Sequence, residues 1–242
     1  IRLELKEDET EFSNASRLEG IIKRYSNFIP YPIRLGDQQF NTQEAIWAQP
    51  REEVSAEDHT EFYRFVTGDA GEPMYTVHLS IDAPVQYRAL LYIPQSLSNE
   101  VLYSPNTQGI DLYASKVKIQ SDSKDLLPLY LRFMRGLVDT EDLPLNVSRE
   151  MVQNNPLLGR LRNSLTGRVL RNLQELADTD SDAYTKFWNQ FGKVLKEGLS
   201  NDLPNQKRLL ELFRGTTSKT EGSDGLTSLK DFVARMTPDQ KE

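Results

Sequence analysis

The chain contains no cysteine in its 242 residues, so it forms no disulfide bond and no thiolate metal site. Histidine is almost as scarce, and the two that are present, His59 and His78, are not spaced one helical turn apart as a zinc-binding pair would be. Nothing in the spacing of the nearby serines and carboxylates suggests a Ser-His-Asp triad. We therefore expect structural or surface roles for both histidines.

The sequence also lacks the features of membrane, nucleic-acid-binding and nucleotide-binding proteins. No apolar run reaches the roughly 18 residues that a membrane span needs. The 29 Lys and Arg residues are outnumbered by 36 Asp and Glu residues, and the net charge of −7 disfavours binding to nucleic acid. Neither G-x-x-x-x-G-K-[ST] nor G-x-G-x-x-G occurs, so any nucleotide must be held mostly by residues outside this chain.

Apolar residues make up 38% of the chain, and their spacing predicts an α+β fold. Strand-like alternation dominates first, and only helices are expected beyond about residue 155. The predicted strands cover residues 75–81, 86–93, 109–120 and part of 126–138, and the main predicted helices cover residues 13–25, 55–68, 161–173, 184–198 and 204–213. The expected N-caps are Ser13 or Asn14, Ser55 and Ser228, and a loop is expected at residues 215–225.

Two changes in pattern divide the chain into parts. The first lies at residues 154–156, where the strand-like patterns end, and the second lies at residues 198–204. The first residue is not Met, which suggests a piece of a longer protein.

The most informative segment, residues 139–153, joins the last predicted strand to the helical part. Ser148 is a natural N-cap for a helix that begins at Arg149. Arg149 and Gln153 are one turn apart and share a face of that helix, and Asn146 lies just before the cap. An arginine in the first turn opposes the helix dipole, which makes sense if its side chain must reach an anion. Residue chemistry alone favours the simpler alternative, an ion pair between Arg149 and a nearby carboxylate.

Two further features leave alternatives open. Trp47 lies in a polar stretch and is either folded back on its own domain or an exposed contact residue. The basic side of the helix at residues 161–173 is either a solvated face or a docking surface; it carries Arg160, Arg162, Arg168 and Arg171.

Residues 143–150, Leu-Pro-Leu-Asn-Val-Ser-Arg-Glu, resemble the signature of the 90-kDa heat-shock chaperone family. Other landmarks of that family occur in the same order along nearly the whole chain, at residues 25–28, 45–47, 61–63, 131–136, 187–188 and 227–229. The long charged linker of eukaryotic cytosolic members is missing, which points to the bacterial type or its mitochondrial relative.

The resemblance implies a middle domain of α+β class. Residues 16–156 would form a larger αβα-layered part and residues 157–200 a helical connector. Residues 201–242 would begin a smaller, mainly helical part of a second αβα unit. Residues 1–15 would be the end of the preceding ATP-binding domain and its linker.

The resemblance also implies a role in ATP hydrolysis. Arg149 would contact the γ-phosphate of ATP, which the N-terminal domain of the parent protein would hold together with Mg²⁺, and Gln153 and Asn146 would support that contact. The parent would be a homodimeric, ATP-hydrolysing chaperone of the stress response, whereas this part alone would be inactive and would hold no cofactor.

The expected partners follow from the same resemblance. They are the N-terminal domain, unfolded or partly folded client proteins that contact Trp47, and co-chaperones of the 70-kDa heat-shock type. Neither nucleic acid nor a membrane is an expected partner. The expected location is the bacterial cytoplasm or, alternatively, the mitochondrial matrix. A second function is open, a pure protein-interaction module in which Trp47 and the helix with Phe187 and Trp188 carry binding and Arg149 is structural.

Overall fold

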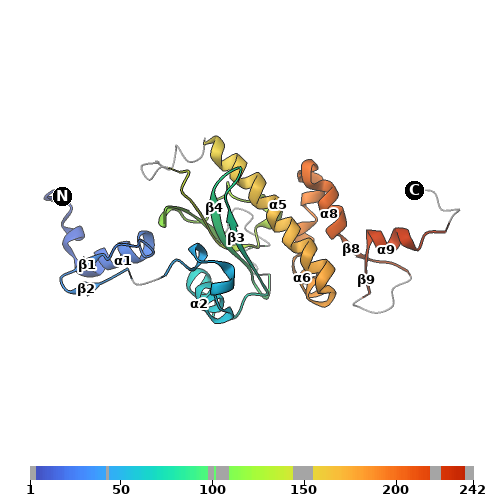
Figure 1. Ribbon diagram of the computed structural model, residues 1–242, viewed down its shortest axis with the longest axis horizontal. Coiled ribbons are helices and arrows are strands. Elements are labelled where there is room, and N and C mark those ends of the chain that lie inside the picture. Colours follow the sequence, from blue (N-terminus) through green and yellow to red (C-terminus); the bar gives the residue numbers. More distant parts are fainter. Residues whose placement is uncertain are drawn as a thin grey trace.

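The computed structural model describes residues 4–41, 44–97, 101, 109–143, 155–218 and 225–237. A five-stranded sheet lies at its centre (Figure 1). In spatial order its strands are β3 (Tyr75–Ile81), β4 (Tyr87–Ile93), β7 (Arg135–Thr140), β5 (Gly109–Ala114) and β6 (Val117–Gln120). Neighbouring strands are antiparallel except β5 and β7, which are parallel. Two small hairpins flank this body, β1 (Arg34–Leu35) with β2 (Gln38–Gln39) and β8 (Arg214–Thr216) with β9 (Leu226–Ser228).

Helices account for most of the remaining described structure, so the α+β prediction is confirmed. The α-helices are α1 (Ala15–Tyr25), α2 (Ala56–Thr67), α5 (Pro156–Thr179), α6 (Ser181–Leu195), α7 (Gly198–Asn201), α8 (Gln206–Leu212) and α9 (Leu229–Ala234). The short 3-10 helices are η1 (Thr10–Ser13), η2 (Ile46–Ala48), η3 (Arg51–Glu53), η4 (Leu129–Leu131) and η5 (Leu203–Asn205). The predicted caps are confirmed at Asn14, Ser55 and Ser228, whose side chains accept hydrogen bonds from the first turns of α1, α2 and α9.

The central sheet packs against a core on each face. Successive side chains of a strand point to opposite faces, so one strand contributes to both cores. In β4, Ala89, Leu91 and Ile93 belong to the main core with α5 and α6. Leu90 and Tyr92 belong to a second core with Trp47 and α2. Figure 1 shows α2 and α5 on opposite sides of the sheet.

The long helices pack as the apolar period predicts. Leu161, Leu165, Val169 and Leu173 of α5 are each at most 1% exposed, so the predicted stripe is the buried face of the helix. The apolar positions predicted for α6 are buried as well, and they are Tyr184, Phe187, Trp188, Phe191, Val194 and Leu195. No helix within the described ranges is long and apolar enough to cross a membrane.

Two predictions about strands are wrong. The single strand expected at residues 109–120 is a hairpin, because Ser115 and Lys116 adopt positive φ angles of 47° and 67° and turn the chain between β5 and β6. The expectation of helices alone beyond residue 155 fails at β8 and β9. Each of these strands is three residues long, which is too short to show an alternating pattern.

Candidate functional site

The three residues predicted to act on ATP, Asn146, Arg149 and Gln153, lie outside the described residues. The structure does describe the two elements between which they lie in the sequence, the end of β7 and the start of α5. The side chains that fix those two ends are the described part of the candidate site.

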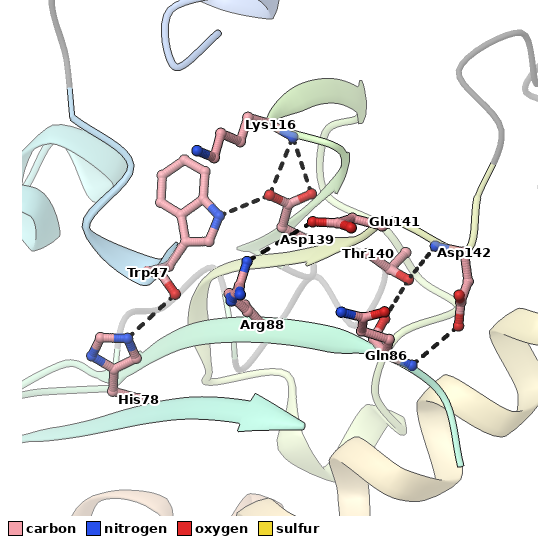
Figure 2. Close-up of polar contacts among 9 residues, drawn as sticks. All are labelled: Trp47, His78, Gln86, Arg88, Lys116, Asp139, Thr140, Glu141 and Asp142. Carbon is pink, nitrogen blue, oxygen red and sulfur yellow. Dashed lines mark hydrogen bonds and ion pairs between the residues drawn. The ribbon is translucent and has the colours of Figure 1, made fainter. Parts of the chain in front are cut away.

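A ring of three hydrogen bonds fixes the end of β7 to the start of β4 (Figure 2). The Thr140 hydroxyl donates to the carbonyl oxygen of Gln86 at 2.7 Å, and the Gln86 amide donates to the Asp142 carboxylate at 3.1 Å. The Asp142 amide closes the ring by donating to the Thr140 hydroxyl oxygen at 3.2 Å. Leu143 follows and is only 2% exposed in the main core. We refer to Gln86, Thr140 and Asp142 as the anchor ring.

The start of α5 is fixed in a different way. The Asn155 side chain accepts a hydrogen bond from the Leu157 amide at 3.0 Å, which caps the helix, and Pro156 occupies the first helical position. Leu157 and Leu158 are buried in the main core, so the first turn is held against the sheet. The chain therefore leaves and re-enters the described structure at two well-packed points.

Trp47 is completely buried, which decides between the two interpretations of this residue. Its indole Nε1 donates to the Asp139 carboxylate at 2.9 Å, and its ring packs edge-on against Phe28 at 4.6 Å between centroids. The indole is folded back on its own domain because the sheet face formed by Leu90 and Tyr92 covers it. The interpretation of Trp47 as an exposed residue is therefore wrong, and its contact with client proteins stays a prediction.

Asp139 is a buried carboxylate in β7, directly before Thr140 of the anchor ring. Its carboxylate accepts a hydrogen bond from the indole Nε1 of Trp47. The backbone amide of Lys116 also donates to it and lies 3.2 Å from each carboxylate oxygen. Burial raises the pKa of Asp139 above its ordinary value, while the hydrogen bonds from Trp47 and Lys116 oppose that rise. Asp139 thus ties the second core to the strand that leads to Arg149 (Figure 2).

The two histidines lie together beside Trp47. The Nε2 atom of His78 is 3.4 Å from the Trp47 carbonyl oxygen, and the rings of His59 and His78 are 5.4 Å apart. Their location between α2 and the sheet agrees with the expected structural role. No group of three or more His, Asp or Glu side chains suited to a metal ion occurs in the part of the chain that the structure describes.

The basic side of α5 is partly solvated. Arg160 and Arg171 are exposed, whereas Arg162 and Arg168 are half-buried. The stripe of arginines is therefore not a single continuous exposed surface, and its use for docking stays a prediction.

Sequence reasoning missed the anchor ring and Asp139. Asp139 and Trp47 are 92 positions apart, and Gln86 and Asp142 are 56 positions apart, so no local spacing connects them. One available signal was a carboxylate directly after the apolar residues Leu137 and Val138 of a predicted strand, since a charge there must find buried partners.

Comparison with known proteins agrees with the resemblance seen in the motifs. The family described as "Hsp90 protein" matches residues 35–242. The chaperone protein HtpG of Chlorobium luteolum is 42% identical over 245 residues, which covers 100% of this chain and 39% of that relative. HtpG of Nitratidesulfovibrio vulgaris is 42% identical over 242 residues, covering 100% of this chain and 38% of the relative. HtpG of Desulfitobacterium hafniense is 41% identical over 241 residues, covering 100% of this chain and 39% of the relative.

The chain thus spans about 39% of the length of the curated relatives that it matches. Its match to the family covers the β7 end, α5 and the residues between them, where the predicted functional residues lie. The chain belongs to the Hsp90 family of chaperones.

Proposed function

We propose that this chain is the middle part of an ATP-hydrolysing chaperone and that Arg149 stabilises the γ-phosphate of ATP bound by another domain of the parent protein. The carrying observation is the position of Arg149, between the anchored end of β7 and the capped start of α5, in a chain of the Hsp90 family. A guanidinium is always charged and offers several donors in a fixed plane, which suits the charge that develops during phosphoryl transfer. Gln153 and Asn146 would support that contact.

The two fixed ends support this role for a physical reason. A group that stabilises a transition state must be held close to its productive position, and a displacement of about 1 Å costs roughly 100-fold in rate. Side chains placed on rigid elements meet this requirement better than side chains on free loops. The anchor ring on one side and Asn155 on the other fix the two ends of the segment that contains Arg149.

The wider assignment follows the family. The parent protein would hold ATP and Mg²⁺ in its N-terminal domain, act as a homodimer, and bind unfolded clients and 70-kDa-type co-chaperones in the bacterial cytoplasm or, alternatively, the mitochondrial matrix. In this proposal residues 1–15 are the end of the preceding ATP-binding domain and its linker, and residues 16–156 form the larger part of the middle domain. Residues 157–200 form a helical connector to the smaller part, which begins with residues 201–242.

Steady-state ATPase activity of the full-length parent carrying Arg149→Ala tests the proposal. Loss of a preorganised charge-stabilising donor lowers kcat by about 100-fold to 1,000-fold. Affinity for ATP, measured by calorimetry, should stay the same because the nucleotide is held elsewhere. Arg149→Lys should restore only part of the rate, since an ammonium lacks the planar fork.

Arg160→Ala is the matched control because Arg160 is an exposed arginine on the nearby first turns of α5. It should leave turnover unchanged. Near-normal turnover of Arg149→Ala, with folding and ATP binding intact, would contradict the catalytic role. That outcome would favour the alternative in which the chain is a protein-interaction module and Arg149 is structural.

A further inference from the structure

Both histidines of the chain meet in one interface, where α2 packs on the sheet. His59 lies on α2 and His78 on β3, and their rings are 5.4 Å apart at an angle of 86°. His78 is 9% exposed, and His59 is half-buried with its ring 6.3 Å from that of Tyr92. Two imidazoles therefore share a mostly apolar contact between two layers of the fold.

One contact of His78 selects the tautomer of its neutral ring. The carbonyl oxygen of Trp47, 3.4 Å away, can only accept, so Nε2 of His78 carries the hydrogen. Nδ1 is then the bare nitrogen of a neutral ring, and it is buried without a partner among the described residues. Nδ1 of His59 is also buried without a partner within those ranges. Protonation would place an N–H group and a charge where neither is compensated.

The surrounding charges do not offset this cost. Arg51 of η3 repels a positive charge on either ring, and a charge on His78 disfavours a charge on His59. Glu52 attracts His78, and Asp58 attracts His59, but the Asp58 carboxylate already accepts two hydrogen bonds from Ser55 in the cap of α2. Tyr92, the other titratable side chain here, buries its hydroxyl without a partner among the described residues.

Burial is the largest cause that holds the pKa of both histidines below the ordinary value of 6.5. For His59 the charges of His78 and Arg51 add to the effect, whereas for His78 the Trp47 carbonyl opposes it. A base with a lowered pKa binds fewer protons in the packed state than in the released state. The packed state is therefore fully favoured above about pH 6.5 and loses stability as the pH falls below that value.

We propose that His59 and His78 form a proton-sensitive latch that holds α2 and the Trp47 segment, residues 45–48, against the sheet. Neutral rings keep the latch closed, and protonation of the pair releases the two segments while the sheet and α5 remain folded. The separation of the two cores makes such local release physically reasonable. Trp47, Phe62 and Tyr63 belong to the second core, whereas α5 and α6 pack in the main core on the opposite face.

Asp139 acts in the opposite direction. Its carboxylate holds the other end of Trp47, and its raised pKa means that the packed state binds its proton more tightly than the released state does. Acidification therefore weakens the histidine side of the Trp47 contact, whereas protonation of Asp139 favours the packed state.

Hydrogen exchange of the 242-residue chain, read by mass spectrometry at about pH 7.5 and about pH 5.5 and corrected for intrinsic rates, tests the latch. Amide protection in residues 45–48 and 56–67 should fall by up to about tenfold per histidine, because pH 5.5 lies one unit below the ordinary pKa of 6.5. Protection in β4 and β7 should not change. An equal fall throughout the chain, or no fall in α2, would overturn the proposal.

Variants and titration complete the test. The His59→Gln, His78→Gln double variant should lose most of the pH response, whereas Glu57→Gln, which removes an exposed charge from the same helix, should keep it. The chain has two histidines and so gives two ring-proton NMR signals, which His59→Gln assigns. In the wild type both should titrate below 6.5, and His78→Gln should raise the pKa of His59, because the charge of His78 helps to lower it. Titration of both at the ordinary value would refute the latch without any variant.

Discussion

Asp139 shows at the scale of one residue how a costly group becomes useful. A buried carboxylate is unfavourable unless its oxygens are hydrogen-bonded, and here Trp47 and Lys116 provide three such contacts. The same bonds place the indole of Trp47 over the sheet and hold the turn between β5 and β6 against β7. One side chain thus links three parts of the chain that are distant in sequence.

Replacing Asp139 should separate the effect of its bonds from that of its charge. Asp139→Leu leaves the Trp47 indole and the Lys116 amide without an acceptor and should lower the free energy of unfolding by about 1–3 kcal/mol. Asp139→Asn keeps one acceptor oxygen and should lose less. Urea unfolding near neutral pH measures both values, and equal losses would show that the bonds do not matter.

The raised pKa of Asp139 also predicts a pH dependence. Because the folded state binds this proton more tightly than the unfolded state, wild-type stability should rise relative to Asp139→Asn as the pH falls from neutral through the raised pKa toward the ordinary 3.8. Other carboxylates cancel in the comparison. A difference between the two proteins that does not change with pH would contradict the raised pKa.

At the scale of helices and strands, the sequence predicted the features that depend on neighbouring residues in the chain, such as the caps and ends of helices. Ser55 is the expected N-cap of α2 and forms a capping box with Asp58, and Gly68 ends that helix with a φ of 70°. The burial of Trp47 and the anchor ring were not predictable, because they depend on which strands become neighbours. Of the candidate site, sequence reasoning identified the segment that contains Arg149 but not the residues that hold its ends.

Gly136 provides a test of how β4 and β7 approach one another. It has a φ of 124°, and a Cβ atom there would collide with the backbone carbonyl of Leu90. Gly136→Ala should therefore destabilise the fold by about 1–3 kcal/mol or more, since backbone cannot move aside as a flexible side chain does. Thermal or urea unfolding measures this loss.

Gly159→Ala is the matched control for that substitution. Gly159 lies in α5 with nothing within 4 Å of the added Cβ and no unusual φ. Alanine is the better helix former, so this variant should be more stable by up to about 1 kcal/mol. If both glycine variants behaved alike, the close approach of Gly136 to Leu90 would not be the cause.

At the scale of the whole molecule, the sheet carries different layers on its two faces, and the segment with Arg149 follows β7, its central strand, in the sequence. The anchor ring joins the end of β7 to the start of β4, while Asp139 joins the same strand to the second core. In the proposed function, the middle part positions a charge toward a nucleotide that it does not itself hold. The precision of that placement then depends on the anchor ring.

Thr140→Val in the full-length parent tests this dependence. The variant keeps the shape of the side chain but removes the hydroxyl that bonds both Gln86 and Asp142. Turnover of ATP should fall about 10-fold to 100-fold through loss of positioning, while affinity for ATP stays unchanged. Thr76→Val, the same change on β3, should leave turnover normal, and equal rates for both variants would remove the anchor ring from the mechanism.

The placement of the two tryptophans has a spectroscopic consequence. Trp47 is enclosed in the second core beneath α2, whereas Trp188 lies in the main core with the Lys196 ammonium 5.3 Å from its ring. Each face of the sheet therefore contains one tryptophan in its own electrostatic surroundings. In a Trp188→Phe background, emission would report the α2 layer alone, without an added label.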